Sequence, residues 1–182
     1  GGAGNDTINA EDDLKLDDTI DGGDGTDTLT IDAAVSSSTV FGSVSNIEVI
    51  KPLNAIDITA NGTLGGAQTF DLSSAGNNTL TLTAGKWTGD TTVNLSTTTE
   101  DGSGNSDDVI NAANVALTVN SRDDDVDSTT TLTGGTGTDI LNLTATGDAT
   151  GSVLTAVTGF EQINVVDAVT AGTSIKITPN LT

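Results

Sequence analysis

Apolar and polar residues alternate one by one in short runs along the chain. Every second residue in a run is mostly Leu, Ile, Val or Ala, and the residues between are mostly Thr, Asn, Asp, Ser or Lys. A period of two residues gives a β-strand one apolar face, so the runs predict strands that are buried on one side. The predicted strands are 28–32, 55–59, 79–83, 91–95, 116–120, 140–144 and 174–178.

Turn-forming residues separate these runs. Clusters of Gly, Asn and Asp stand between them at steps of roughly 10 to 20 residues, and no segment has the period of an amphipathic helix longer than about two turns. The 182 residues include 34 Thr and 22 Gly. Thr is β-branched and favours strands, whereas Gly favours turns. These features together predict an all-β fold.

The sequence repeats itself over a long interval. The segment GGDGTDTL at 22–29 matches GGTGTDIL at 134–141 with an offset of 112 residues, and VSNIEVI at 44–50 matches VTGFEQI at 157–163 with an offset of 113. Two matches that keep nearly the same spacing indicate a duplication. We therefore expect one repetitive segment, part of a longer chain, divided into a first turn at 1–21, repeat unit one at 22–133 and the start of unit two at 134–182.

Charge and missing residue types exclude several classes of function. Lys and Arg total 5 and Asp and Glu total 26, which gives a formal net charge of −21. This balance excludes a nucleic-acid surface, which needs clustered Lys and Arg, and argues against docking on an anionic membrane. The absence of Cys and His removes disulfides, zinc–thiolate sites and the commonest general base. No apolar run approaches the roughly 20 residues of a membrane span.

A nine-residue motif occurs three times. The pattern G-G-x-G-x-D-x-U-x, in which U is a large apolar residue, stands at 1–9, 22–30 and 134–142. Gly allows backbone conformations that other residues avoid and can turn loop carbonyls toward an ion, while the sixth-position Asp adds a carboxylate. Calcium takes 6–8 oxygen ligands in a loose geometry, which a pair of stacked loops can supply.

These three motifs resemble the repeats of the RTX family of secreted bacterial calcium-binding proteins. The resemblance implies a parallel β-helix or β-roll (a β-solenoid) with Asp/Gly-rich calcium-binding loops, folding on several calcium ions, and type I secretion to the cell exterior. The longer pattern is similar to repetitive regions of RTX surface-layer proteins and large adhesins. A regular RTX roll has a turn of about 18 residues, whereas here Gly1 and Gly22 are 21 residues apart and Gly22 and Gly134 are 112 apart.

The resemblance implies calcium ligands in all three motifs. We expect Asp6 and Asp27 to stack one turn apart, and we expect Asp139 to find its partner loop in the acidic cluster at 123–127. The alternative for each loop is a plain β-turn. The candidate ligands in the motifs are Gly2, Gly4, Asp6, Gly23, Asp24, Gly25, Asp27, Gly135, Gly137 and Asp139.

Two further acidic segments are candidate calcium loops. Oxygen-bearing side chains alternate in 101–110 as in the first half of an EF-hand, but Ser106 and Ala112 replace the Gly and Glu of that loop, so a degenerate RTX loop is the better interpretation. Four carboxylates within 123–127 would repel one another without a cation. A flexible polar loop and a solvated charge run are the alternatives. The candidate ligands are Asp101, Asn105, Asp107, Asp108, Asp123, Asp125 and Asp127.

Little in the sequence points to catalysis. No acid pair stands apart from the calcium-like loops, and five basic residues with few aromatics offer little to bind a sugar or stabilise an oxyanion. The single Trp, Trp87, stands next to Lys86, where it could stack on a sugar, anchor a neighbouring subunit or fill the core. We therefore expect a protein segment that is not an enzyme.

The sequence favours a calcium-binding structural segment of a secreted bacterial cell-surface protein, of the surface-layer, filament or lattice type. Such a segment would fold and self-assemble on calcium, with other copies of the chain as partners and a surface polysaccharide as a second candidate partner. The alternative is a calcium-stabilised stalk or ligand-binding module of an RTX adhesin or toxin.

Overall fold

The computed structural model describes residues 1–10, 14, 18–31, 41, 43–60, 68–73, 77–83, 87, 89–95, 107–122, 125–126, 129–144, 154 and 156–166. Within these residues all regular secondary structure is β-strand, and each strand pairs with its neighbours in parallel. The all-β prediction is therefore confirmed.

Most strands belong to two sheets. The larger sheet contains β2 (Thr7–Asn9), β5 (Thr28–Ile31), β7 (Val49–Pro52), β9 (Gln68–Asp71), β11 (Thr91–Asn94), β13 (Leu117–Arg122), β15 (Ile140–Thr144) and β17 (Gln162–Val166). The smaller sheet contains β8 (Asp57–Ala60), β10 (Thr79–Leu82), β12 (Val109–Ala112), β14 (Thr131–Thr133) and β16 (Val157–Thr158). Two short pairs complete the fold: β1 (Gly2–Ala3) with β4 (Gly23–Asp24), and β3 (Ile20–Asp21) with β6 (Val44–Ser45).

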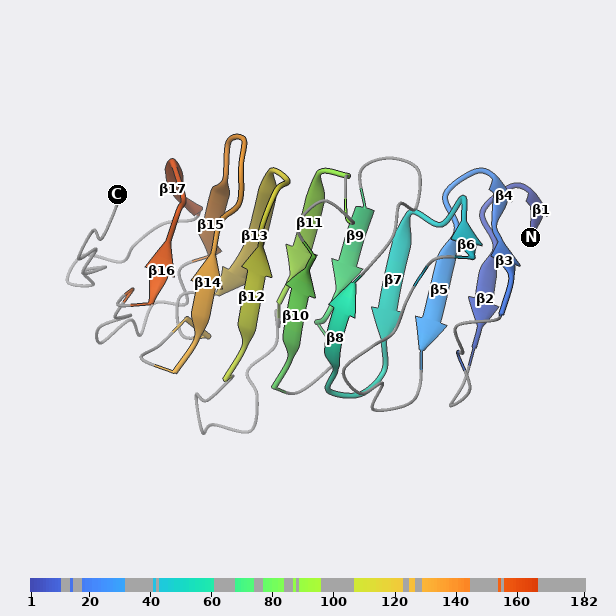
Figure 1. The fold of residues 1–182 in the computed structure, drawn as a ribbon, viewed down its shortest axis with the longest axis horizontal. Helices are drawn as coiled ribbons and strands as arrows, with labels where there is room; N and C mark the ends of the chain where they lie inside the picture. Colours follow the sequence, from blue (N-terminus) through green and yellow to red (C-terminus); the bar gives the residue numbers. More distant parts are fainter. Residues whose placement is uncertain are drawn as a thin grey trace.

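From β7 onward the chain alternates between the two main sheets, so it winds as a β-solenoid (Figure 1). We call each circuit, from one strand of the larger sheet to its neighbour in that sheet, a rung. Thr7 lies beside Thr28, a rung of 21 residues, whereas Thr92 lies beside Thr118, a rung of 26 residues. The predicted β-solenoid is confirmed, with rungs longer and less regular than those of a tandem RTX roll.

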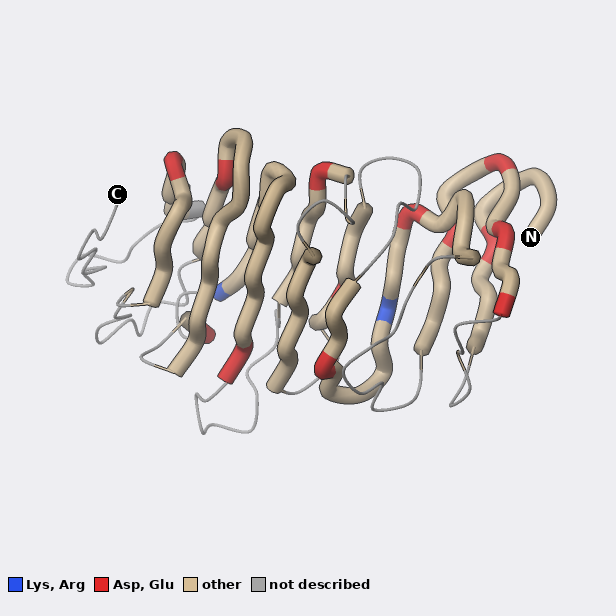
Figure 2. The backbone as a smooth tube through the Cα atoms, in the orientation of Figure 1, with Lys and Arg blue, Asp and Glu red and all other residues tan. Residues whose placement is uncertain are grey.

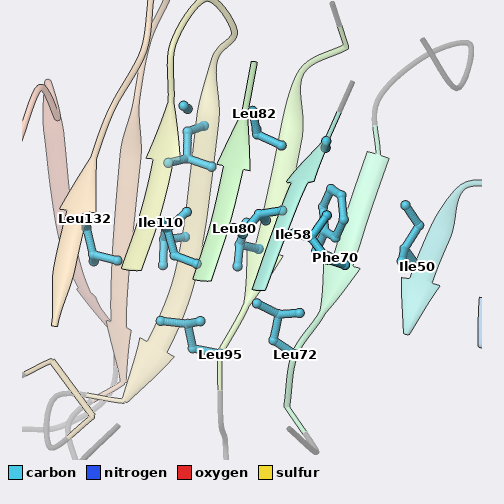
Figure 3. Close-up of a cluster of buried hydrophobic side chains, with 14 of the residues drawn as sticks. Ile50, Ile58, Phe70, Leu72, Leu80, Leu82, Leu95, Ile110 and Leu132 are labelled. Carbon is cyan, nitrogen blue, oxygen red and sulfur yellow. The ribbon is translucent and has the colours of Figure 1, made fainter. Parts of the chain in front are cut away.

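Apolar side chains from both sheets fill the space between them. Leu80 lies in register with Ile58 on one side and Ile110 on the other, and all three are fully buried. Figure 3 shows these side chains pointing inward between the sheets. Because the strands are parallel and in register, equivalent residues of successive rungs stack in columns, and period-two alternation is enough to build the core.

Trp87 belongs to this core. It is 2% exposed, its ring centroid lies 5.6 Å from that of Phe70 and 6.4 Å from that of Phe41, and its indole N–H donates to Thr91 Oγ1 at 2.8 Å. The hypothesis that this ring stacks on a sugar or anchors a subunit is therefore wrong, because the ring is already covered on the inside of the solenoid.

Six of the seven strands predicted from alternation coincide with observed strands, and the seventh, 174–178, lies outside the described residues. Alternation did not single out 49–52 or 68–71, which form β7 and β9. Val49 is apolar at an outward position, and the inward positions 52 and 68 hold Pro and Gln in place of a typical apolar strand residue. Both segments join the sheet because they lie in register between rungs that do alternate.

Candidate functional site

The first two motif loops lie directly on top of each other. Gly2 pairs with Gly23 across β1 and β4, and the N–H of Gly4 donates to the carbonyl of Asp24 at 2.7 Å. The Asn5 side chain accepts from the N–H of Thr26 at 3.0 Å. The predicted stacking of the loops that carry Asp6 and Asp27 is therefore confirmed.

The motif glycines have two separate physical roles. At the fourth position Gly4, Gly25 and Gly137 have φ angles of 114°, 142° and 123°, a backbone region that side chains disfavour. At the first position the requirement is space. A Cβ on Gly22 would lie 2.6 Å from Asp27 Oδ2 and would collide with the carbonyl of Asn46, a residue of the next rung.

Two of the motif aspartates, Asp27 and Asp139, point back into their own loops and bond to the preceding rung. Asp27 and Asp139 are fully buried. Asp27 Oδ1 accepts the N–H of Asp6 at 2.7 Å, and Asp139 Oδ1 accepts the N–H of Leu117 at 2.6 Å. In both carboxylates the second oxygen, Oδ2, is buried and has no hydrogen-bond partner among the described residues.

Two glutamates continue this arrangement into the following rung. Glu48 Oε2 accepts the N–H of Asp27 at 2.8 Å, and Glu161 Oε2 accepts the N–H of Asp139 at 2.8 Å. These residues were not among the predicted ligands, although the duplicated segments 44–50 and 157–163 contain both of them. Their equal positions in the two repeats are the sequence signal that could have identified them.

The expected partner loop for Asp139 is wrong. The loop at 134–139 lies between the segment 112–117 and the segment 158–161, through contacts of Gly135 with the Ala112 carbonyl and of Gly134 with Gly159. In a parallel solenoid a loop stacks on the loop that precedes the neighbouring strand. Asp125, the described acidic residue of the cluster 123–127, instead follows β13 and lies near Thr130, just before β14.

A second corner of the solenoid holds part of the two other predicted acidic segments. Asp108 is 2% exposed, and its Oδ1 accepts from the backbone N–H and the side-chain amide of Asn78 at 2.8 and 3.0 Å. Asn78 Oδ1 in turn accepts the N–H of Ile56. Because the carboxylate is already bonded to an amide side chain, Asp108 has a structural role of its own.

Asp108, just before β12, and Thr130, just before β14, lie on neighbouring rungs, because Val109 pairs with Thr131. Thr130 Oγ1 donates to the carbonyl of Asp125, which is buried, so Asp125 lies one rung from Asp108. Asp107 is exposed and accepts from the Asn77 amide at 3.3 Å. The predicted ligands Asp101, Asn105, Asp123 and Asp127 lie outside the described residues.

Burial makes the ionised form of Asp139, in the third motif, less favourable. It raises the pKa of the Asp139 carboxyl above its ordinary value of 3.8, and the nearby Glu161 carboxylate raises it too, while the hydrogen bond from the Leu117 N–H lowers it. The ionised form of Asp139 is thus disfavoured unless a cation or a proton balances it.

The donor set at the motif loops is compatible with calcium but small. Among the described residues no three acidic side chains gather into one group. A calcium ion there would take the buried Oδ2 of Asp27 or Asp139 as its carboxylate ligand and loop carbonyl oxygens for the rest, which suits a hard cation with flexible coordination.

Among the described residues, Asp and Glu lie mainly near the strand ends, and few charged residues lie along the strands themselves (Figure 2). On the outer face of the larger sheet, Lys51 and Asp71 form an ion pair at 3.3 Å. Further along the same face the amides of four asparagines bond rung to rung at 2.7, 2.8 and 2.9 Å. This asparagine ladder, which the sequence analysis did not identify, consists of Asn94, Asn120, Asn142 and Asn164.

No helix among the described residues is long and apolar enough to cross a membrane. No family model matches the sequence, and it has no significant match among curated proteins or solved structures.

Proposed function

We propose that this chain is a calcium-binding structural segment of a secreted bacterial cell-surface protein, of the surface-layer, filament or lattice type. Calcium would bind at the stacked G-G-x-G-x-D loops, and it would drive folding and self-assembly. No catalytic role is assigned to the segment.

One observation carries the calcium proposal: the buried, unpartnered Oδ2 atoms of Asp27 and Asp139. An ionised oxygen that is removed from water without a partner is costly, and the same arrangement occurs in both copies of the repeat. Asp27 would hold one calcium ion together with oxygen atoms of its loop, and Asp139 would hold another in the same way. When bound, calcium supplies positive charge and coordination between successive rungs.

Charge makes folding depend on that ion. A chain of net charge −21 repels itself when compact. A ligand that binds only the folded state stabilises it by RT ln(1 + [L]/Kd) at each site, so several sites make folding steeply dependent on calcium. Such a chain remains loose in a low-calcium cytosol and folds after export.

The solenoid also suits self-assembly. Its strands run parallel and in register, and such a stack can be extended by strands of another copy at an unpaired edge. Because few charged residues lie along the described strands, copies can approach each other despite the acidic loops.

The test is a calcium titration of the EDTA-treated chain, followed by circular dichroism and by fluorescence of the buried Trp87, with magnesium in parallel. The unaltered chain should gain β-structure and tryptophan burial cooperatively with calcium and not with magnesium. Asp27→Asn and Asp139→Asn should each weaken the response, while Asp57→Asn, which removes one exposed charge outside the motifs, should leave it unchanged. A full β spectrum in EDTA, unchanged by calcium, would refute calcium-driven folding.

Assembly is tested separately on the calcium form. Electron microscopy of the purified chain should show a regular lattice or filament, which disperses when calcium is removed. Binding to a glycan without self-association would favour the adhesin stalk or ligand-binding module instead.

A further inference from the structure

The glutamates of the two repeats make the same contact in the same place. Glu48 is one rung after Asp27, and Glu161 is one rung after Asp139. In each case Oε2 accepts the backbone N–H of the motif Asp at 2.8 Å. The residue two positions before each Glu, Asn46 or Gly159, has a positive φ, 51° or 74°. The whole corner is therefore duplicated, and not only one hydrogen bond.

Asp27 and Asp139 are thus each fixed at two points, with one oxygen left over. The following Glu holds its N–H, and an N–H of the preceding rung holds its Oδ1. The atom without a hydrogen-bond partner among the described residues is Oδ2, in Asp27 and again in Asp139. The Glu contact fixes the main chain that carries this carboxylate.

The contact at Asp6 shows which residue normally holds the N–H of a motif Asp when another motif follows. The N–H of Asp6 is held by Asp27, the Asp of the next motif, at 2.7 Å. Neither Asp27 nor Asp139 is followed one rung later by another motif, and there Glu48 or Glu161 makes the contact. The longer side chain reaches the same N–H from a rung without the G-G-x-G-x-D loop.

We propose that Glu48 and Glu161 are positioning residues that stand in for the Asp of a following motif and orient the calcium-binding carboxylates of Asp27 and Asp139. The inference rests on the proposed calcium function. It assigns a role to the glutamates, and it means that a single motif can bind calcium without a tandem neighbour.

The test measures calcium affinity by isothermal titration on the full chain, with four variants. Asp139→Asn identifies the contribution of the third motif. Glu161→Ala, which removes the acceptor, should weaken calcium at that motif about 10–100-fold, as loss of an outer-shell partner does. Glu161→Gln keeps the length and an acceptor oxygen, and should bind calcium nearly as tightly as the unaltered chain, well short of the loss in Glu161→Ala. Glu161→Asp keeps the charge but is too short, and should resemble Glu161→Ala.

The outcomes separate the two hypotheses. If the unaltered chain binds no calcium, the proposed function and this inference both fail. If it binds and Glu161→Ala keeps full affinity while unfolding at a lower urea concentration in calcium, Glu161 is merely structural and only the inference fails. If Glu161→Gln is as weak as Glu161→Ala, the carboxylate charge matters and positioning is refuted. Should Glu161→Ala not fold, the Gln and Asp variants decide.

Discussion

Single acidic side chains of this protein bond to the backbone of a neighbouring rung. Asp27, Asp139, Glu48 and Glu161 each accept a main-chain N–H from the rung before. Acidic side chains therefore hold rungs together at the corners, directly before the strands of the larger sheet begin. Each carboxylate Oδ2 left over in the motif aspartates is what favours a cation at these positions.

Asp71 provides a pH test at this scale. Burial raises its pKa, but hydrogen bonds from Ser73 and Lys51 and the Lys51 charge outweigh burial and leave the pKa below the ordinary value of 3.8. A lowered folded pKa adds stability above pH 3.8 that is lost as the pH falls through the folded pKa. Asp71→Asn should therefore cost about 0.2–1 kcal/mol at neutral pH and nothing measurable at strongly acid pH.

Urea denaturation followed by Trp87 fluorescence measures this difference. Thr69→Ala, on the same strand and the same outward face, is the uncharged control, and its effect should not vary with pH. A deficit of Asp71→Asn that persists at strongly acid pH would contradict the proposed origin of the pKa shift.

At the scale of the strand, side chains at equivalent positions of successive rungs form columns and bond to one another. Because the larger sheet is parallel and in register, Asn94, Asn120, Asn142 and Asn164 fall on one line, and each amide can donate to its neighbour and accept from the next. Amide ladders of this kind stabilise parallel in-register sheets. A single asparagine in the sequence looks like any polar outward residue, and the ladder exists only because the rungs stack.

Asn120→Ala should lower the free energy of unfolding by about 1–3 kcal/mol, because Asn120 both donates to Asn94 and accepts from Asn142. Thr118→Ala, on the neighbouring outward column of the same strand, should change it by less than about 0.5 kcal/mol. Chemical denaturation of both variants in calcium provides the comparison. Equal effects would mean that the ladder contributes nothing beyond an ordinary surface position.

The molecule as a whole separates its charges from its core. The two sheets enclose an apolar interior, and the acidic residues of the described part of the chain lie mainly near the strand ends (Figure 2). Since only 5 basic residues face 26 acidic ones, the folded state concentrates negative charge that pairing within the chain cannot neutralise. Ions from solution must supply that neutralisation, either bound at sites or as a diffuse atmosphere.

Salt should therefore stabilise the calcium-free chain. Raising NaCl from about 0.01 M to about 1 M shortens the screening length from about 30 Å to about 3 Å, so repulsion between corners fades. We expect the β-structure content of the chain in EDTA to increase over this range, and that of the calcium-bound chain to change much less. Circular dichroism at a fixed temperature measures it, with sucrose as the control for non-ionic stabilisation. A β signal in EDTA that does not respond to NaCl would contradict the repulsion argument.

Much of the fold follows from local pattern. Alternating segments such as 79–83 and 140–144 become strands in the structure, and the stacking of Asp6 near Asp27 follows from the 21-residue repeat of the motif. The partner of Asp139 could not be found in this way. Rung lengths vary with the loops, so counting residues does not reveal which loop becomes its neighbour.

By itself, the sequence determined the strand type, the all-β class and the positions of the motif loops, because alternation with period two and the needs of glycine are properties of neighbouring residues. Only the tertiary structure decided that Trp87 is buried, that Glu48 and Glu161 hold the motif aspartates, and that four asparagines form a ladder. The contacts of the glutamates and asparagines join residues 20 or more positions apart, and the burial of Trp87 depends on which side of the chain faces the interior. They are therefore fixed by the register of one rung on the next.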